Sequence, residues 1–159
     1  MRYDDGGTAA VTTLVMLPLL LIVLVGVLEL GALRAIVYRA TAAADLATIV
    51  AVSDQDQAEL TRTGILRLAP DAADVARDYF ARNLSATAPA LAASPHEIAE
   101  TADVASFPSA PTVDPRTGAT YDRPTVRLIA SVPVKTPAFA LLLLPAVTTL
   151  TIRSASSPR

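Results

Sequence analysis

The chain has 159 residues, a formal net charge of −2 and a hydrophobic fraction of 52%. It contains no cysteine, which excludes disulfide bonds, thiol catalysis and cysteine-based zinc sites. It also lacks a run of basic residues, so the composition argues against nucleic-acid binding.

The first predicted element is a long helix over residues 8–52, preceded by a short leader over residues 1–7. From Leu14 to Leu28 every residue is apolar or glycine except Pro18. A bilayer core about 30 Å thick requires about 20 helical residues, so we predict one membrane span over about residues 11–33. The pair Gly6-Gly7 is expected to interrupt regular structure before this helix, and Pro18 is a candidate kink.

Charge does not define the orientation of this span. Arg2 and the N-terminal amine flank one end, and Arg34 and Arg39 flank the other. Acidic residues contribute little to the positive-inside rule, so the charge balance favours neither orientation.

The helix beyond the span has an unusual pattern. Its polar or amphipathic residues recur at helical spacing and form one narrow stripe, whereas most other positions are Ala, Ile, Val or Leu. A small head covers one side of such a helix, so we infer that neighbouring copies or partner helices cover the rest. A longer membrane-embedded portion is the alternative. The stripe consists of Arg34, Tyr38, Thr41, Asp45 and Thr48.

Residues 53–159 are predicted to form a small head, which the resemblance described below implies is extracytoplasmic. Polar residues 53–57 end the long helix, and residues 71–84 form an amphipathic helix with Asp71 as its cap and Tyr79 and Phe80 in the core. Ser94-Pro95-His96-Glu97 has the form of a capping box that begins a short helix.

The remainder of the head is predicted to be mostly extended. Residues 101–107 and 125–134 read as strands, with a turn at residues 114–118 and a final strand at 148–154. Pro133 suggests an edge position or a strand end. Residues 139–144 are apolar and form either a buried crossover turn or a patch that touches the membrane or a partner. The expected fold class is therefore α+β, with a helix on a mainly antiparallel sheet.

The sequence gives little support for catalysis. His96 is the only histidine, and no nucleophile elbow, phosphate loop or metalloprotease motif is present. We therefore predict no enzymatic activity, no catalytic residue, no metal, no cofactor and no small-molecule substrate.

Glu29 is the one charged residue within the predicted span. An acidic group at the centre of a bilayer costs about 2.5–3.5 kcal/mol, and the cost falls toward the interface. Depending on the depth of the span, Glu29 either contacts a neighbouring subunit or reaches interfacial water.

The order of features along the helix resembles the N-terminal region of TadE/TadG-like proteins, which are minor pilins of bacterial tight-adherence pilus systems. The similarity covers about residues 6–52: the Gly6-Gly7-Thr8 start, the Pro18 segment, Glu29 between two glycines, and the Ala42–Ala47 stretch with Asp45. The head is similar only in layout, a helix followed by strands.

The resemblance implies a single-pass protein of the cytoplasmic membrane, with its N-terminus inside, its head outside, and a structural role in pilus assembly, adhesion or secretion. Lipid and other pilin-like subunits would be its partners, the latter through the N-terminal helix. Candidate assembly or helix-packing residues are Glu29, Arg34, Ala43 and Asp45.

The resemblance also suggests a processing site. Some relatives are cut after a glycine, with a glutamate five residues beyond the cut, so Gly6, Gly7 and Thr8 are the candidate residues here. A cut after Gly7 would place Thr12 at that position, and a cut after Gly6 would place Val11 there. A processed and an unprocessed form both stay open.

A second hypothesis assigns the helix a smaller role. The chain would be a single-pass, membrane-tethered accessory or binding module that acts through its head, with no part in a pilus. A heterologous membrane helix could then replace the native one without loss of function.

Overall fold

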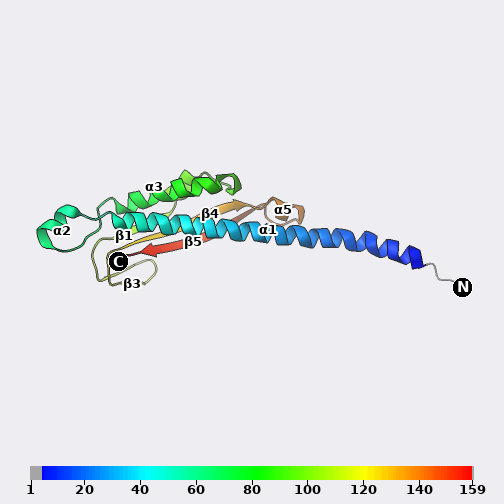
Figure 1. The fold of residues 1–159 in the computed structure, drawn as a ribbon, viewed down its shortest axis with the longest axis horizontal. Coiled ribbons are helices and arrows are strands. Elements are labelled where there is room, and N and C mark those ends of the chain that lie inside the picture. Colours follow the sequence, from blue (N-terminus) through cyan, green and yellow to red (C-terminus); the bar gives the residue numbers. More distant parts are fainter. Residues whose placement is uncertain (1–4, 159) are drawn as a thin grey trace.

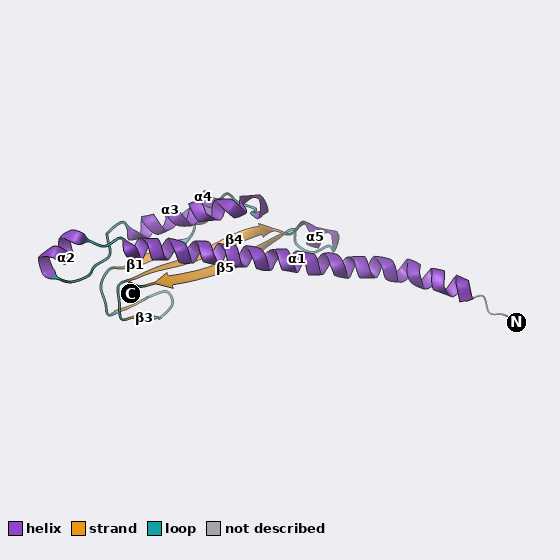
Figure 2. Ribbon diagram, in the orientation of Figure 1, coloured by secondary structure: helices purple, strands orange, loops and turns teal. Residues whose placement is uncertain are grey.

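The computed structural model describes the backbone of residues 5–158 and the side chains of residues 11–158. One long helix, α1 (Asp5–Ser53), extends beyond a small α+β head (Figure 1). Its C-terminal part packs with a second helix on one face of an antiparallel sheet, as the sequence predicts. Figure 2 shows these helices lying along the strands. Of the predicted leader, residues 1–4 lie outside the described residues.

Helix α1 begins earlier than the sequence suggests. It starts at Asp5, so Gly6 and Gly7 lie inside the helix and do not interrupt it, and it continues through Pro18. Glycine weakens a helix by about 1 kcal/mol relative to alanine but does not forbid one, and proline removes a single backbone hydrogen bond. The predicted end is confirmed, because the helix stops at Ser53 where the polar run begins.

The two halves of α1 have opposite environments. From Val11 to Leu30 the large apolar side chains are mostly exposed, and none of the most apolar stretch is buried by the rest of the chain. By length and composition, α1 is the single candidate membrane span within residues 5–158. Further along, alanines on one face are almost fully buried, because their small side chains let the head approach closely. These alanines are Ala40, Ala43, Ala44, Ala47 and Ala51.

A short helix, α2 (Gln57–Thr63), follows and was not predicted from the sequence. The Asp56 carboxylate caps it by accepting a hydrogen bond of 2.9 Å from the backbone N–H of Glu59. Gly64 ends it in the left-handed conformation, with φ of 70°. None of its residues is buried, so local capping rather than core packing specifies it.

The predicted amphipathic helix is confirmed as α3 (Ala72–Leu84), which packs along α1. Phe80 is fully buried, whereas Tyr79 is 37% exposed, so only one of the two predicted core aromatics lies in the core. Asp71 occupies the cap position, but its side chain makes no capping hydrogen bond. A 3-10 helix, η1 (Ser85–Ala90), follows, and α4 (Pro95–Glu100) begins with the predicted capping box of Ser94 and Glu97.

The sheet has the strand order β1-β4-β5, with antiparallel pairing throughout. Its strands are β1 (Asp103–Phe107), β4 (Thr125–Lys135) and β5 (Val147–Ser156). The predicted inward face of β4 is confirmed, since every second residue from Val126 to Val134 is almost fully buried, although Thr125 and Arg127 on the other face are buried as well. The predicted turn joins two short strands, β2 (Thr112–Val113) and β3 (Thr120–Tyr121).

Pro133 does not mark an edge strand, because β4 is the central strand of this sheet. Strand β1 pairs only with the first five residues of β4, so Pro133 lies where β4 has no strand on that side. There its carbonyl oxygen accepts a hydrogen bond of 2.9 Å from the Ala92 N–H. Proline is tolerated because no ladder bond requires its missing N–H.

A last helix, α5 (Pro137–Leu141), connects β4 to β5. Of the two alternatives for this apolar segment, the structure shows the exposed patch: Leu141 is 79% exposed and Leu143 is 97% exposed. The connection is therefore not a buried turn.

Candidate functional site

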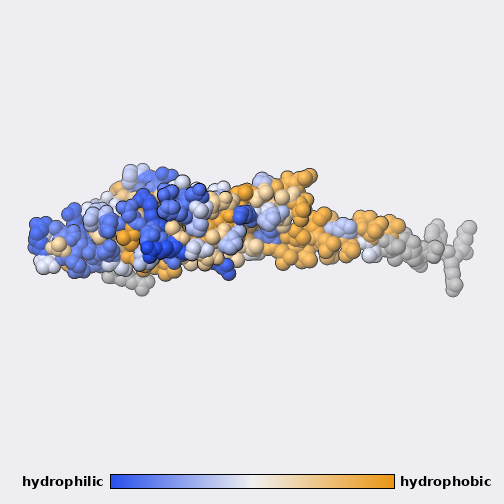
Figure 3. Space-filling model, turned by 90° about the horizontal axis from the view of Figure 1, so that it is seen from above, coloured by the Kyte–Doolittle hydropathy of each residue, from blue (hydrophilic) through white to orange (hydrophobic). Residues whose placement is uncertain are grey.

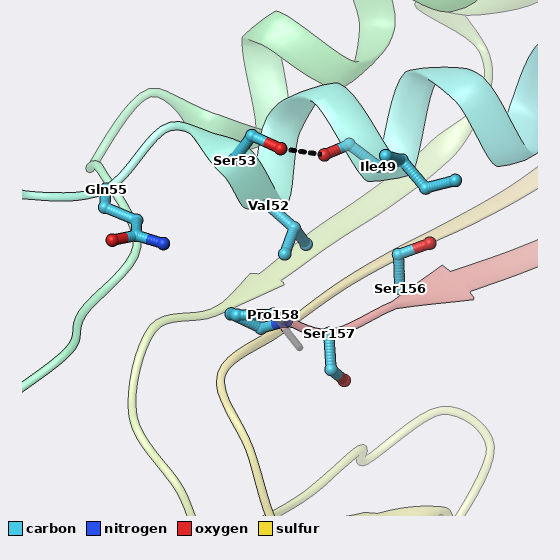
Figure 4. A pocket seen from close by; sticks show the side chains of 7 residues that line it. All are labelled: Ile49, Val52, Ser53, Gln55, Ser156, Ser157 and Pro158. Carbon is cyan, nitrogen blue, oxygen red and sulfur yellow. Dashed lines mark hydrogen bonds between the residues drawn. The ribbon is translucent and has the colours of Figure 1, made fainter.

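A hollow of about 650 Å³ lies between the end of α1 and the end of β5 (Figure 4). Among residues 11–158, no ionisable side chain lines it, so these residues offer hydroxyl and amide groups but no acid or base. One of its hydroxyls, that of Ser53, is already bonded to the Ile49 carbonyl at 2.9 Å. The described lining residues therefore supply hydrogen-bonding groups only. The lining residues are Ile49, Val52, Ser53, Gln55, Ser156, Ser157 and Pro158.

The described residues contain no group of three or more His, Asp or Glu side chains that could hold a metal ion. His96 lies exposed on α4, with its Nε2 atom 3.2 Å from Glu100 Oε1 one helical turn later. This exposed pair matches the ordinary i,i+4 spacing on a helix surface.

A charged cluster lies where the β2–β3 hairpin meets β4. Arg127 is 5% exposed, and its guanidinium contacts both oxygens of Asp103 at 2.9 and 3.3 Å. Its Nε atom lies 2.8 Å from Oδ2 of the fully buried Asp114, an ion-pair distance without hydrogen-bond alignment. Arg116 contacts Asp103 from the surface at 2.9 Å. Each charge in the cluster therefore has an opposite charge beside it, as in a structural ion-pair network.

The environment of this cluster favours ionised carboxylates. Arg127 lowers the pKa of Asp103, chiefly through its hydrogen bonds. Burial acts to raise the pKa of Asp114, but the hydroxyl of Thr117, the backbone N–H of Arg116 and the charge of Arg127 together lower it.

We therefore expect acid to weaken the fold. Because both pKa values are lower in the folded state, the stability they contribute is present above the unfolded-state pKa, near 4, and is lost as the pH falls through the folded-state values. Urea unfolding of the full chain in non-ionic detergent between pH 7 and pH 3 measures this. An Asp103→Asn/Asp114→Asn variant should lose less stability over this range, and an unchanged pH dependence would contradict the assignment.

Two of the candidate assembly residues act inside the chain. Ala43 is 4% exposed and belongs to the core. Asp45 accepts a hydrogen bond of 2.7 Å from the Ser154 hydroxyl on β5. Thr48, about one helical turn further along α1, is fully buried. Its hydroxyl oxygen lies 3.0 Å from that of Ser154 and 2.9 Å from that of Ser156. This end of the polar stripe thus fastens α1 to β5.

The other candidates lie on the part of α1 before the core. Glu29 is half-buried and Arg34 is exposed, and neither makes an ion pair among residues 11–158. Gly6, Gly7 and Thr8 lie in the first turns of α1, and their side-chain surroundings fall outside the described residues. Among the described side chains, Glu29 and Arg34 belong to no common site with Ala43 or Asp45.

The head leaves one face of this part of α1 uncovered, as the sequence analysis inferred, although the sequence did not identify the residues of that face. Tyr38 is 75% exposed, and Leu46 and Ile49 are 53% and 52% exposed. A shallow hollow of about 310 Å³ beside Leu46 separates this face from η1. The signal that could have located it was the spacing of the buried alanines, because the uncovered face lies opposite them. This uncovered face consists of Ala35, Tyr38, Arg39, Ala42, Leu46 and Ile49.

Comparison with family models, curated proteins and solved structures finds no match to this chain.

Proposed function

We propose that the chain is a membrane-anchored, pilin-like structural component of a Tad-type pilus or secretion system. The contrast between the two halves of α1 is the observation that supports this proposal. The N-terminal half is apolar and exposed. The C-terminal half is docked to the head but keeps the large apolar side chains of Leu46 and Ile49 on its uncovered face. A helix that only tethered a soluble head would not need Leu46 and Ile49 on that face. The TadE/TadG-like order of features over residues 6–52 is consistent with this role.

In this proposal, α1 crosses the cytoplasmic membrane with its N-terminus inside and its head outside. The uncovered face then packs against other pilin-like subunits or further copies of the chain. Glu29 and Arg34 lie near the outer end of the span and can meet a neighbouring helix or the lipid headgroups.

The accessory-module hypothesis has one observation in its favour. The head itself buries the alanine face of α1, so the fold does not need a neighbour on that side. The two functions therefore differ in what occupies the uncovered face.

Cross-linking at the uncovered face tests the proposal. The chain lacks cysteine, so Leu46→Cys and Ile49→Cys each introduce a single thiol. In native membranes under mild oxidation, we expect both variants to form disulfide-linked dimers with a second copy. After attachment of a thiol-reactive photo-cross-linker and illumination, we expect covalent adducts with a second copy or another subunit. Ala47→Cys, at a fully buried position one residue from Leu46, should not react.

A further control separates assembly from random collision. Ala58→Cys is exposed on α2, at the opposite end of the head from the span. Adducts at Ala58→Cys as abundant as those at Leu46→Cys would contradict a specific interface. A helix exchange tests the accessory-module hypothesis. Replacing residues 8–32 with an unrelated membrane helix leaves the core of the head unchanged. If the exchanged protein keeps full function and Leu46→Cys forms no adducts, the result would favour the accessory module.

A further inference from the structure

The connection between β4 and β5, residues 137–146, presents an apolar surface at one end of the head; we call it the leucine loop. Leu141, Leu143 and Leu144 are 79%, 97% and 51% exposed. No charged residue occurs anywhere in residues 136–152. Figure 3 shows apolar residues continuing from the projecting part of α1 onto this end of the head, whereas the opposite end is hydrophilic.

Internal hydrogen bonds hold the leucine loop in a defined conformation. The buried Thr136 fixes its two ends together: its N–H donates to the Ala146 carbonyl at 2.8 Å, and its hydroxyl donates to the Pro145 carbonyl at 2.9 Å. At the tip, the N–H of Leu144 donates to the Phe139 carbonyl at 3.0 Å. Such internal bonds reduce the number of backbone groups that require water, which is a condition for contact with lipid.

The tip also holds an unfavourable conformation. Leu143 has φ of 59°, in the left-handed region that branched apolar residues rarely adopt. This conformation directs into the surroundings a leucine that no other residue covers. Strain of this kind usually persists where it serves a function, and here its effect is to present an apolar side chain outward.

The position of the leucine loop along α1 follows from the bonds between α1 and β5. Ser154 is level with Asp45 and Thr48, to which it is hydrogen-bonded. Val147 lies seven residues earlier on β5, which is about 23 Å at about 3.3 Å per residue. That distance corresponds to about 15 residues of helix, so Val147 is level with about residues 30–33 of α1.

The leucine loop precedes Val147 and lies beyond the ends of β4 and β5, beside α1 and on the side of its N-terminus (Figure 1). It therefore reaches the level at which the predicted span ends, at about residue 33. Lys135, which pairs with Val147, and Arg34 are both exposed near this level. Basic side chains at the edge of an apolar surface suit the headgroup region of a bilayer.

We propose that the leucine loop is a second membrane contact, which inserts Leu141, Leu143 and Leu144 into the bilayer that α1 spans. Continuity with the span identifies lipid as the occupant of this surface. The insertion would fix the tilt and rotation of the head relative to the membrane, because two separate points then hold it. This inference rests on the proposed membrane anchoring by α1.

The test uses the full chain in phosphatidylcholine and phosphatidylglycerol vesicles, with an environment-sensitive fluorophore on one introduced cysteine. At Leu143→Cys we expect a blue shift of the emission, and a loss of intensity when the vesicles contain lipids with a nitroxide near the headgroup. Val113→Cys is the matched control, because Val113 is also an exposed apolar residue but lies in β2, which pairs with β3 away from this end of the head (Figure 1). It should show neither effect.

A third position, Leu20→Cys, reports on the anchor itself and is tested with lipids that carry the nitroxide deep in the acyl chain, because Leu20 lies near the centre of the predicted span. Quenching at Leu20→Cys without quenching at Leu143→Cys would overturn the leucine-loop proposal and leave the anchor standing. A blue shift at Leu143→Cys without lipid quenching, accompanied by cross-links to another copy, would also overturn it, because a second copy would then cover the loop. Absence of quenching at Leu20→Cys would overturn both proposals.

Discussion

Replacing Phe80 with alanine is expected to lower the free energy of unfolding by about 3–5 kcal/mol. Phe80 is fully buried on α3, in the core that α3 shares with α1 and the sheet. Removing the ring loses its apolar burial and leaves a cavity that closely packed neighbours fill only in part. Urea unfolding of the full chain in non-ionic detergent, followed by circular dichroism, measures the loss.

Its neighbour Tyr79 provides the matched control. Tyr79 is 37% exposed, and its ring lies 5.6 Å from the guanidinium carbon of Arg82 on the surface of the helix. Tyr79→Ala should therefore cost about 1 kcal/mol, mainly through the lost cation–π contact and partial packing. Equal losses for the two variants would show that α3 does not face the core as described.

Replacing Arg127 with alanine is expected to cost a similar amount, about 3–5 kcal/mol. The substitution leaves Asp114 fully buried without its neighbouring cation, and Asp103 loses a two-point contact. An uncompensated charge in the interior is expensive, so the β2–β3 hairpin should detach from β4. Faster hydrogen exchange in the hairpin and a lower urea midpoint would measure this.

Two variants define the cause of that loss. Arg116→Ala removes a largely exposed partner of Asp103 and should cost at most about 1 kcal/mol. Arg127→Met/Asp114→Asn removes both buried charges and should recover part of the stability that Arg127→Ala loses. No recovery in the double variant would indicate that side-chain packing, rather than charge, explains the effect.

Much of the α+β fold follows from local sequence patterns. The alternation from Val126 to Val134 predicted β4, and the capping box at Ser94 predicted the start of α4. These predictions succeed because side-chain period and terminal hydrogen bonds are properties of a few adjacent residues. By contrast, α2 was missed because its only signals are a cap and a terminal glycine around a polar stretch with no buried residue.

The candidate assembly residues show where such local reasoning stops. The polar stripe of α1 was identified from its spacing alone, with no partner assigned to it, and Thr48 on that stripe is fully buried and bonded to β5. A hydroxyl or carboxylate can form hydrogen bonds with water or with a protein group far away in the sequence. The residue type alone does not tell which of these two partners it has. Only the strand more than 100 residues later, with Ser154 and Ser156, decides the partner.

The amino-acid sequence by itself determined that α1 is long and apolar enough to span a membrane, because the length of an apolar run depends on no other segment. It also determined the helix-then-strands order of the head. Only the tertiary structure decided which face of α1 the head covers, and that the leucine loop lies beside α1 at the end of the head from which the N-terminal half of α1 projects. Both depend on contacts between residues far apart in the chain, which no local pattern of residues encodes.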